Sequence, residues 1–132
     1  MDFGLTSEQE LLRDTVRDVL ARHAGREAVR ELEQTHLFPR AAWHALAEIG
    51  VLGLTLPESE GGAGGSVLDL VVVIEELGRA SLSLAIPAVT TVSQGSKVLS
   101  QLGRDDQKAR FLPELIAGKL ITTLAWTERS LA

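Results

Sequence analysis

A nearly unbroken aliphatic segment behind a helix start signal is the feature that most limits how this chain can fold. From Leu68 to Leu77 the residues are aliphatic apart from three carboxylates. Ser66 followed by Asp69 is a capping-box pattern, in which each side chain bonds the other residue's backbone N–H at a helix N-terminus. A helix that is apolar on nearly all sides is stable when other elements cover it. The sequence therefore predicts a central helix from about Ser66 to Gly78.

Apolar residues at helical spacing, together with start and stop signals, predict four more helices around this one. Thr6 with Gln9 or Ser7 with Glu10 is a further capping box, and Pro39 suits the first turn of a helix. Pro87 is expected in the first turn of its helix or at a kink, and Pro113 is expected to interrupt the last helix. The four ranges are about 6 to the low thirties, 39–50, 82–102 and 105–113.

The end of the chain has a different composition. The segment "LITTLAWTE" is rich in β-branched and aromatic residues and contains no helix breaker, which favours a strand. A single strand after five helices has no partner to pair with. We therefore predict an all-α domain of about five helices over residues 1–118, followed at 119–132 by the start of a β domain that is mostly absent.

Composition excludes several classes of function. Thirteen basic and eighteen acidic residues give a net charge of −5, which argues against nucleic acid as a partner. There is no cysteine, so neither a disulfide nor a cysteine-based metal site is possible, and the three histidines lack metal-ligand spacing. The longest aliphatic run is far shorter than a membrane span, and the first residues lack a leader pattern. We expect no metal, no membrane span and a cytoplasmic location.

The Gly-rich stretch "LPESEGGAGGS" raises the possibility of a phosphate-binding loop. A dinucleotide fingerprint counted from Gly62 places Val67 where its third glycine belongs, and a P-loop would need a lysine that the stretch lacks. We therefore predict a connector between helices. On the following helix Glu75 and Glu76 cannot face each other as an acid/base pair, and Glu76 with Arg79 is expected to form a surface ion pair.

The predicted fourth helix has an unusual middle. Residues 90–97 read "TTVSQGSK", which are small and polar beside the strongly apolar positions Ile86, Val89, Val92 and Val98. Such a face lets two helices approach closely, or it leaves room for a ligand chain. Both interpretations stay open at this point, with close packing favoured because cavities are few in any domain.

Several segments in order resemble a known family. The segments "LTSEQELLRDTVRDVLA", "FPRAAWHALAEIGVLGLTLPESEGGAGGS", "EELGRAS" and "LGRDDQKARFLPELIAGKLITTLAWTE" cover essentially the whole chain. Together they resemble the amino-terminal helical domain of the FAD-dependent acyl-CoA dehydrogenases. In that family a helical domain precedes a middle β domain and a carboxy-terminal helical bundle, so the resemblance assigns residues 119–132 to the start of the middle domain.

The resemblance implies an oxidoreductase of lipid metabolism. In this family a glutamate removes the α-proton of an acyl-CoA thioester and the β-hydrogen leaves as hydride to the flavin, which gives the trans-2-enoyl product. That glutamate usually lies in the carboxy-terminal domain, so we expect no catalytic residue here and no activity from the 132 residues alone. The implied partners are acyl-CoA, an electron-transfer acceptor protein and further chains of a homo-oligomer or of a heteromer with another acyl-CoA dehydrogenase chain.

The resemblance also nominates binding residues. "LAWTE" is similar to a family strand that ends in Thr/Ser-Glu, so Trp126, through its backbone, and Thr127, through its hydroxyl, are expected to contact FAD. The fourth helix resembles the one that lines the acyl-chain cavity, which makes Thr90, Thr91 and Gln94 the expected substrate neighbours.

One departure from the family pattern supports an alternative. After Thr-Glu the family usually continues Pro-Gly-Ala-Gly-Ser, a turn that helps to hold cofactor and substrate, whereas this chain has Arg129, Ser130, Leu131 and Ala132. Some members of the family pair a catalytic chain with a degenerate one. The alternative is therefore a non-catalytic helical partner subunit that retains the fold without binding flavin.

Overall fold

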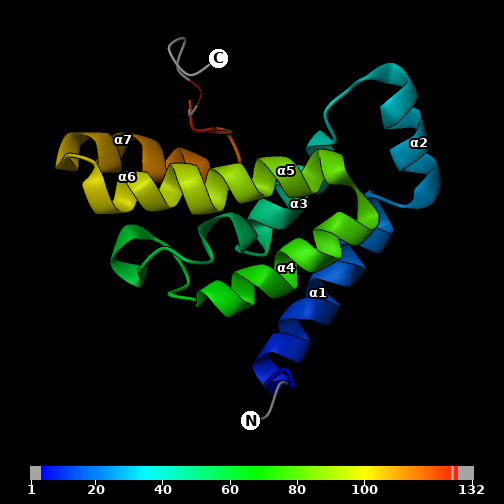
Figure 1. Cartoon of the computed structure of the whole chain (residues 1–132), viewed down its shortest axis with the longest axis horizontal. Coiled ribbons are helices and arrows are strands. Elements are labelled where there is room, and N and C mark those ends of the chain that lie inside the picture. Colours follow the sequence, from blue (N-terminus) through cyan, green and yellow to red (C-terminus); the bar gives the residue numbers. More distant parts are fainter. Residues whose placement is uncertain (1–3, 126, 128–132) are drawn as a thin grey trace.

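A computed structural model describes residues 4–125 and residue 127 of the chain (Figure 1). Within this range the regular elements are helical and no strand occurs. Two short 3-10 helices, η1 (Val51–Gly53) and η2 (Glu58–Glu60), lie in the loop region, and η3 (Thr90–Ser96) is a π-helix. The α-helices are α1 (Ser7–His23), α2 (Arg26–Thr35), α3 (Arg40–Glu48), α4 (Val67–Ala80), α5 (Leu82–Val89), α6 (Lys97–Leu102) and α7 (Asp105–Ile116).

The helices pack against one another around two hydrophobic clusters. Helix α4 lies against α1 on one side and against α5 on the other, and α3 also packs on α1. Elements α5, η3 and α6 follow one another as a single rod, and α7 packs beside α6 at its far end. Helix α2 lies at the opposite end of the molecule, so the two ends of the rod have different surroundings.

The predicted central helix is confirmed as α4. Leu70, Val73 and Leu77 are buried in the main hydrophobic cluster, and Ser66 caps the helix in a complete capping box with Asp69. Burial is not complete, because Val67, Leu68 and Val71 near the start of the helix are exposed. The helix also continues through Gly78 to Ala80.

Three of the predicted helix limits are wrong. The first helix is split into α1 and α2, because Gly25 is extended and acts as the N-cap of a new helix. The fourth helix is divided by the π-helix η3. Helix α7 continues through Pro113 to Ile116, since the buried Leu112 and Leu115 hold both sides of the proline in the core.

The C-terminal segment leaves the helical body after α7. The strand predicted within "LITTLAWTE" is wrong over residues 120–125, which are neither helix nor strand, because no strand in the described range could pair with them. The boundary between residues 118 and 119 therefore stays a prediction.

An ion pair between the half-exposed Arg17 and the buried Glu76 joins α1 to α4. Arg17 donates through Nε to Oε2 of Glu76 at 2.7 Å and through Nη2 to Oε1 at 2.9 Å. The Glu76 side chain is only 6% exposed, and hydrogen bonding to Glu76 raises the pKa of Arg17 above its ordinary value.

The prediction that Glu76 pairs with Arg79 is wrong. Arg79 instead donates to Glu75 at 2.7 Å on the exposed face, because residues four apart are neighbours on a helix.

Two matched variants separate the pair with a buried carboxylate from the fully exposed pair. Arg17→Met leaves the buried Glu76 carboxylate without its partner, which should lower the free energy of unfolding more than the loss of an exposed pair does. Arg79→Met removes the exposed pair and should cost less than about 0.5 kcal/mol. Chemical denaturation of the two variants measures the difference, and equal losses would contradict the burial argument.

The capping box of α4 makes a pH-dependent contribution to stability. The Asp69 carboxylate accepts hydrogen bonds from Gln9 Nε2 at 2.9 Å and from the Ser66 backbone and hydroxyl at 2.7 Å. These bonds, that from Gln9 foremost, lower the pKa of Asp69. A carboxylate with a lowered pKa in the fold stabilises it above its unfolded pKa of about 4, and this contribution is lost as the pH falls through the folded pKa.

We therefore expect Asp69→Asn to destabilise the protein by about 1 kcal/mol at neutral pH, as loss of a cap usually does. The difference between wild type and variant should shrink as the pH falls below about 4. Thermal unfolding of both proteins as a function of pH measures this. A difference that stays constant down to the lowest pH would contradict the assignment to Asp69.

Candidate functional site

The rod changes its helical geometry where the sequence has small and polar residues. In η3 the backbone bonds run to the fifth residue instead of the fourth, and such π segments inside α-helices are frequent at functional sites. Pro87, which lacks an N–H, lies just before η3. The Thr90 N–H bonds the carbonyls of both Ile86 and Pro87, and its hydroxyl donates to Pro87 O at 3.1 Å. The N–H and hydroxyl groups of Thr90 therefore supply hydrogen bonds to the Ile86 and Pro87 carbonyls where the α-helix changes into the π-helix.

The rod contacts two separate hydrophobic clusters. Ala85, Ala88 and Val92 are buried in the main cluster with α1, α3 and α4. Beyond η3, Leu99 packs instead on the smaller cluster formed by Leu56 and α7. The π-helix lies at the transition between these two surroundings.

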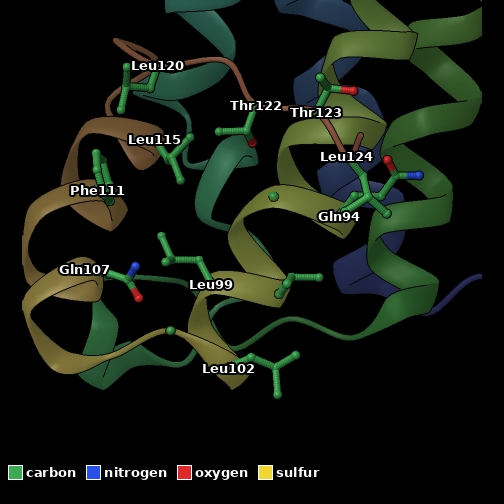
Figure 2. Close-up of a pocket in the computed structure, with 13 residues that line it drawn as sticks. Gln94, Leu99, Leu102, Gln107, Phe111, Leu115, Leu120, Thr122, Thr123 and Leu124 are labelled. Carbon is green, nitrogen blue, oxygen red and sulfur yellow. The ribbon is translucent and has the colours of Figure 1, made fainter. Parts of the chain in front are cut away.

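An apolar pocket opens beside the second half of the rod (Figure 2). Its volume is about 590 Å³, and its walls are η3, α6, α7 and the segment 120–124. None of the residues that line it has an ionisable side chain. The lining consists of Gln94, Gly95, Val98, Leu99, Leu102, Gly103, Gln107, Phe111, Leu115, Leu120, Thr122, Thr123 and Leu124.

The two glutamines of the lining differ in their bonding. Gln107 Oε1 accepts the Arg104 backbone N–H at 3.0 Å and is thus engaged at the start of α7. The Gln94 carboxamide makes no hydrogen bond within the described residues, and Figure 2 shows it near Thr123 and Leu124. The Gln94 carboxamide is therefore one polar group of the pocket that is available to a ligand.

The expected substrate neighbours lie in different surroundings. Gln94 lines the pocket, whereas Thr90 is half-buried with its hydroxyl bonded to its own helix. Thr91 is fully buried, does not line the pocket and bonds the main chain of Thr122. The structure thus brings Gln94 to the pocket, and the substrate contacts of Thr90 and Thr91 stay predictions.

The expected flavin contacts lie at the limit of what the structure describes. The Thr127 side chain is exposed and has no hydrogen-bond partner in the described range. Trp126 lies outside the described residues, as do the four positions from Arg129 onward that depart from the family pattern.

Sequence reasoning missed most of the pocket. Its wall residues on α6 and α7, Leu99, Leu102, Phe111 and Leu115, recur at helical spacing, but this pattern also fits an ordinary core helix. Neither Gly95 nor Thr122 alone belongs to a sequence pattern that indicates a binding site. Only the meeting of η3 with the segment 120–124 in three dimensions makes these positions one site.

The Gly-rich stretch is a connector, as predicted. Its N–H groups are used inside the protein: that of Gly62 donates to Pro57 O, that of Gly64 to Leu56 O, and that of Gly65 to Leu54 O. A Cβ at Gly62 would overlap the Leu56 carbonyl, so the close return of the chain requires glycine there. These bonded amides are not available to a phosphate.

The described residues offer neither a cluster of metal-ligating side chains nor a membrane-spanning helix. No group of three or more potential metal-ligating side chains is present in this part of the chain. Nor does any helix within it combine the length and the apolar character that crossing a membrane requires.

The fold and the pocket define an all-helical domain with an apolar binding space beside its longest rod. The chain belongs to the acyl-CoA dehydrogenase family, because the family described as acyl-CoA dehydrogenase, N-terminal domain, matches residues 6–119. Mitochondrial isovaleryl-CoA dehydrogenase of Pongo abelii is 36% identical over 127 residues, which cover 95% of this chain and 30% of that protein.

Solved structures agree with this assignment. Butyryl-CoA dehydrogenase from Megasphaera elsdenii matches with a TM-score of 0.79 and 29% identity, covering 92% of this chain and 32% of the other. An acyl-CoA dehydrogenase complexed with FAD from Bacillus anthracis matches with a TM-score of 0.78 and 26% identity, covering 89% of this chain and 20% of the other. The chain spans about a third of the length of the curated relatives that it matches.

Proposed function

We propose that this chain is the amino-terminal part of an FAD-dependent acyl-CoA dehydrogenase, which introduces the α,β double bond into acyl-CoA thioesters. The observation that carries the proposal is the apolar pocket of about 590 Å³ beside η3, in a chain that belongs to this family. In this proposal the domain binds and orients the acyl chain, with Gln94 and Thr90 on its border.

The chemistry of the pocket suits an acyl chain. Its volume falls in the usual range for small-molecule sites, about 300–1,000 Å³. Each methylene that moves from water into such a lining contributes about 0.8 kcal/mol. Because no ionisable side chain lines the pocket, a charged group would lose its hydration there without gaining a partner. The lining therefore favours the alkyl end of a substrate over its polar end.

The residues toward the flavin also fit the proposal. The exposed Thr127 hydroxyl, which has no partner in the described range, is free to donate a hydrogen bond. A bound FAD would supply the two-electron oxidation, which protein side chains cannot provide. Thr127 would hold the flavin edge in place relative to the acyl chain. We expect the Trp126 backbone to assist, although this residue lies outside the described range.

Proton transfer and electron removal require groups beyond these residues. The pocket lining contains no carboxylate that could take the α-proton, so we place the catalytic base in another part of the protein. Turnover also needs an acceptor for the electrons, which we propose to be an electron-transfer protein.

Exposed apolar residues such as Leu11, Leu68, Ile86 and Leu102 provide surface on which further domains or chains can pack. This is in keeping with a homo-oligomer or a heteromer.

The alternative of a non-catalytic partner subunit is not favoured. Isovaleryl-CoA dehydrogenase and butyryl-CoA dehydrogenase both align with more than nine-tenths of the chain and are named for the reaction that we propose.

A substitution in the pocket tests the acyl-chain role. In the full-length enzyme, Gln94→Phe should lower kcat/KM for long acyl-CoA substrates by about tenfold or more and that for short ones much less, because the ring fills space that a long chain needs. Ile86→Phe is the matched control, since Ile86 is exposed on the same rod and does not line the pocket. Equal losses for all chain lengths would contradict the proposal.

A second substitution tests the flavin role. Thr127→Val keeps the shape of the side chain and removes the hydroxyl, so the purified full-length protein should retain less FAD or show a shifted visible absorption spectrum. Thr127→Ser keeps the hydroxyl and should restore both properties. A wild-type protein that stays colourless after addition of FAD would instead support the non-catalytic alternative.

A further inference from the structure

The segment 120–125 is held by few polar contacts. The Leu120 N–H donates to Glu114 O at 3.2 Å, at the point where the chain leaves α7. Beyond it, the hydrogen bonds that the described residues provide to positions 121–125 are the two between Thr122 and Thr91. The path of the chain from α7 toward Thr127 therefore depends on one side chain of η3.

Thr91 binds the main chain of Thr122 in both directions. Its Oγ1 accepts the Thr122 N–H at 3.2 Å and lies 3.4 Å from the Thr122 carbonyl oxygen, to which it donates. Thr91 is 0% exposed, so its hydroxyl has no access to solvent and is committed to Thr122. Moving Thr122 away would leave the buried Thr91 hydroxyl without a partner, which makes another placement of Thr122 unfavourable.

Gly95 provides the second half of this contact. It lies one turn after Thr91, and a Cβ built on it would overlap the Thr122 side-chain oxygen and approach its Cβ to 2.7 Å. Thr122 thus lies directly on the helix backbone, with its own Oγ1 buried. Hydrogen bonds from Thr91 and close contact at Gly95 together select one residue of the segment for this place.

We infer that Thr91 is a positioning residue that sets the register of the segment leading to Thr127. The inference rests on the proposed function for the role of Thr127 at the flavin, while the contact itself rests on the geometry of Thr91, Gly95 and Thr122. Thr91 acts through the main chain of Thr122, and no contact with substrate is needed for this role.

Register matters because a slip by one residue at position 122 would move every following residue by one position along the chain. The Thr127 hydroxyl would then no longer lie at the place that the proposed function assigns to it. The two main-chain bonds fix the position of the backbone on η3, and the close contact of the Thr122 side chain with Gly95 distinguishes this residue from its neighbours. Thr91 therefore links the acyl-pocket helix to the predicted flavin contact.

The test uses three variants of the full-length protein in the presence of FAD. Thr91→Val keeps the shape and removes the hydroxyl, whereas Thr91→Ser keeps the hydroxyl. Thr15→Val is the control, because the Thr15 hydroxyl bonds Leu11 O on an exposed face of α1. Hydrogen exchange at the Thr122 amide and the visible absorption of the flavin are measured for each.

We expect Thr91→Val to speed exchange at the Thr122 amide by about tenfold or more and to change the flavin spectrum in the same direction as Thr127→Val. Thr91→Ser and Thr15→Val should leave both readouts close to wild type. Unchanged exchange in Thr91→Val would overturn the inference, as would a flavin spectrum that responds to Thr127→Val but not to Thr91→Val.

The two proposals fail in different ways. If Thr91→Val speeds exchange while neither Thr91→Val nor Thr127→Val alters the flavin, the anchoring of Thr122 stands and the flavin role of Thr127 is contradicted. If Thr91→Val destabilises the fold, Thr91→Ser decides, because wild-type exchange and spectrum in the serine variant show that the hydroxyl itself is the anchor.

Discussion

One helical rod has to pack against two hydrophobic clusters at different points along its length. Its first half buries Ala85, Ala88 and Val92 with α1, α3 and α4, and its second half packs Leu99 on α7. A regular α-helix keeps one stripe of residues on one side, whereas a π turn takes up an extra residue and changes which side chains face inward. The position of the pocket, and of the C-terminal segment that closes it, follows from this change at η3.

Much of the helical fold was predictable because local signals agreed with burial. The capping boxes at Thr6 and Ser66 mark the starts of α1 and α4 as expected. The errors arise where neighbours in space decide. Arg17, rather than Arg79, pairs with Glu76 because α1 packs against α4, and periodicity on one helix carries no information on a partner fifty-nine residues away.

The candidate site was predictable only in part, for the same reason. Residues 90–97 were identified as unusual, and the two interpretations that their composition allowed are both present in the structure. Close packing occurs at Thr91 and Gly95 against Thr122, and open space occurs at Gln94. The path of the segment 120–125 decides which of these residues pack closely and which line the pocket. No sequence pattern within the rod predicts that path.

The glycine at position 95 limits how the pocket can be altered. A single added methyl there would meet Thr122, so variation at this position changes the path of the chain before it changes the shape of the binding space. Gln94, Val98 and Leu102 line the same pocket without such a constraint. A library designed to alter the preferred acyl chain should therefore vary these three positions and keep Gly95 and Thr91 fixed, so that diversity is not spent on variants with a displaced segment.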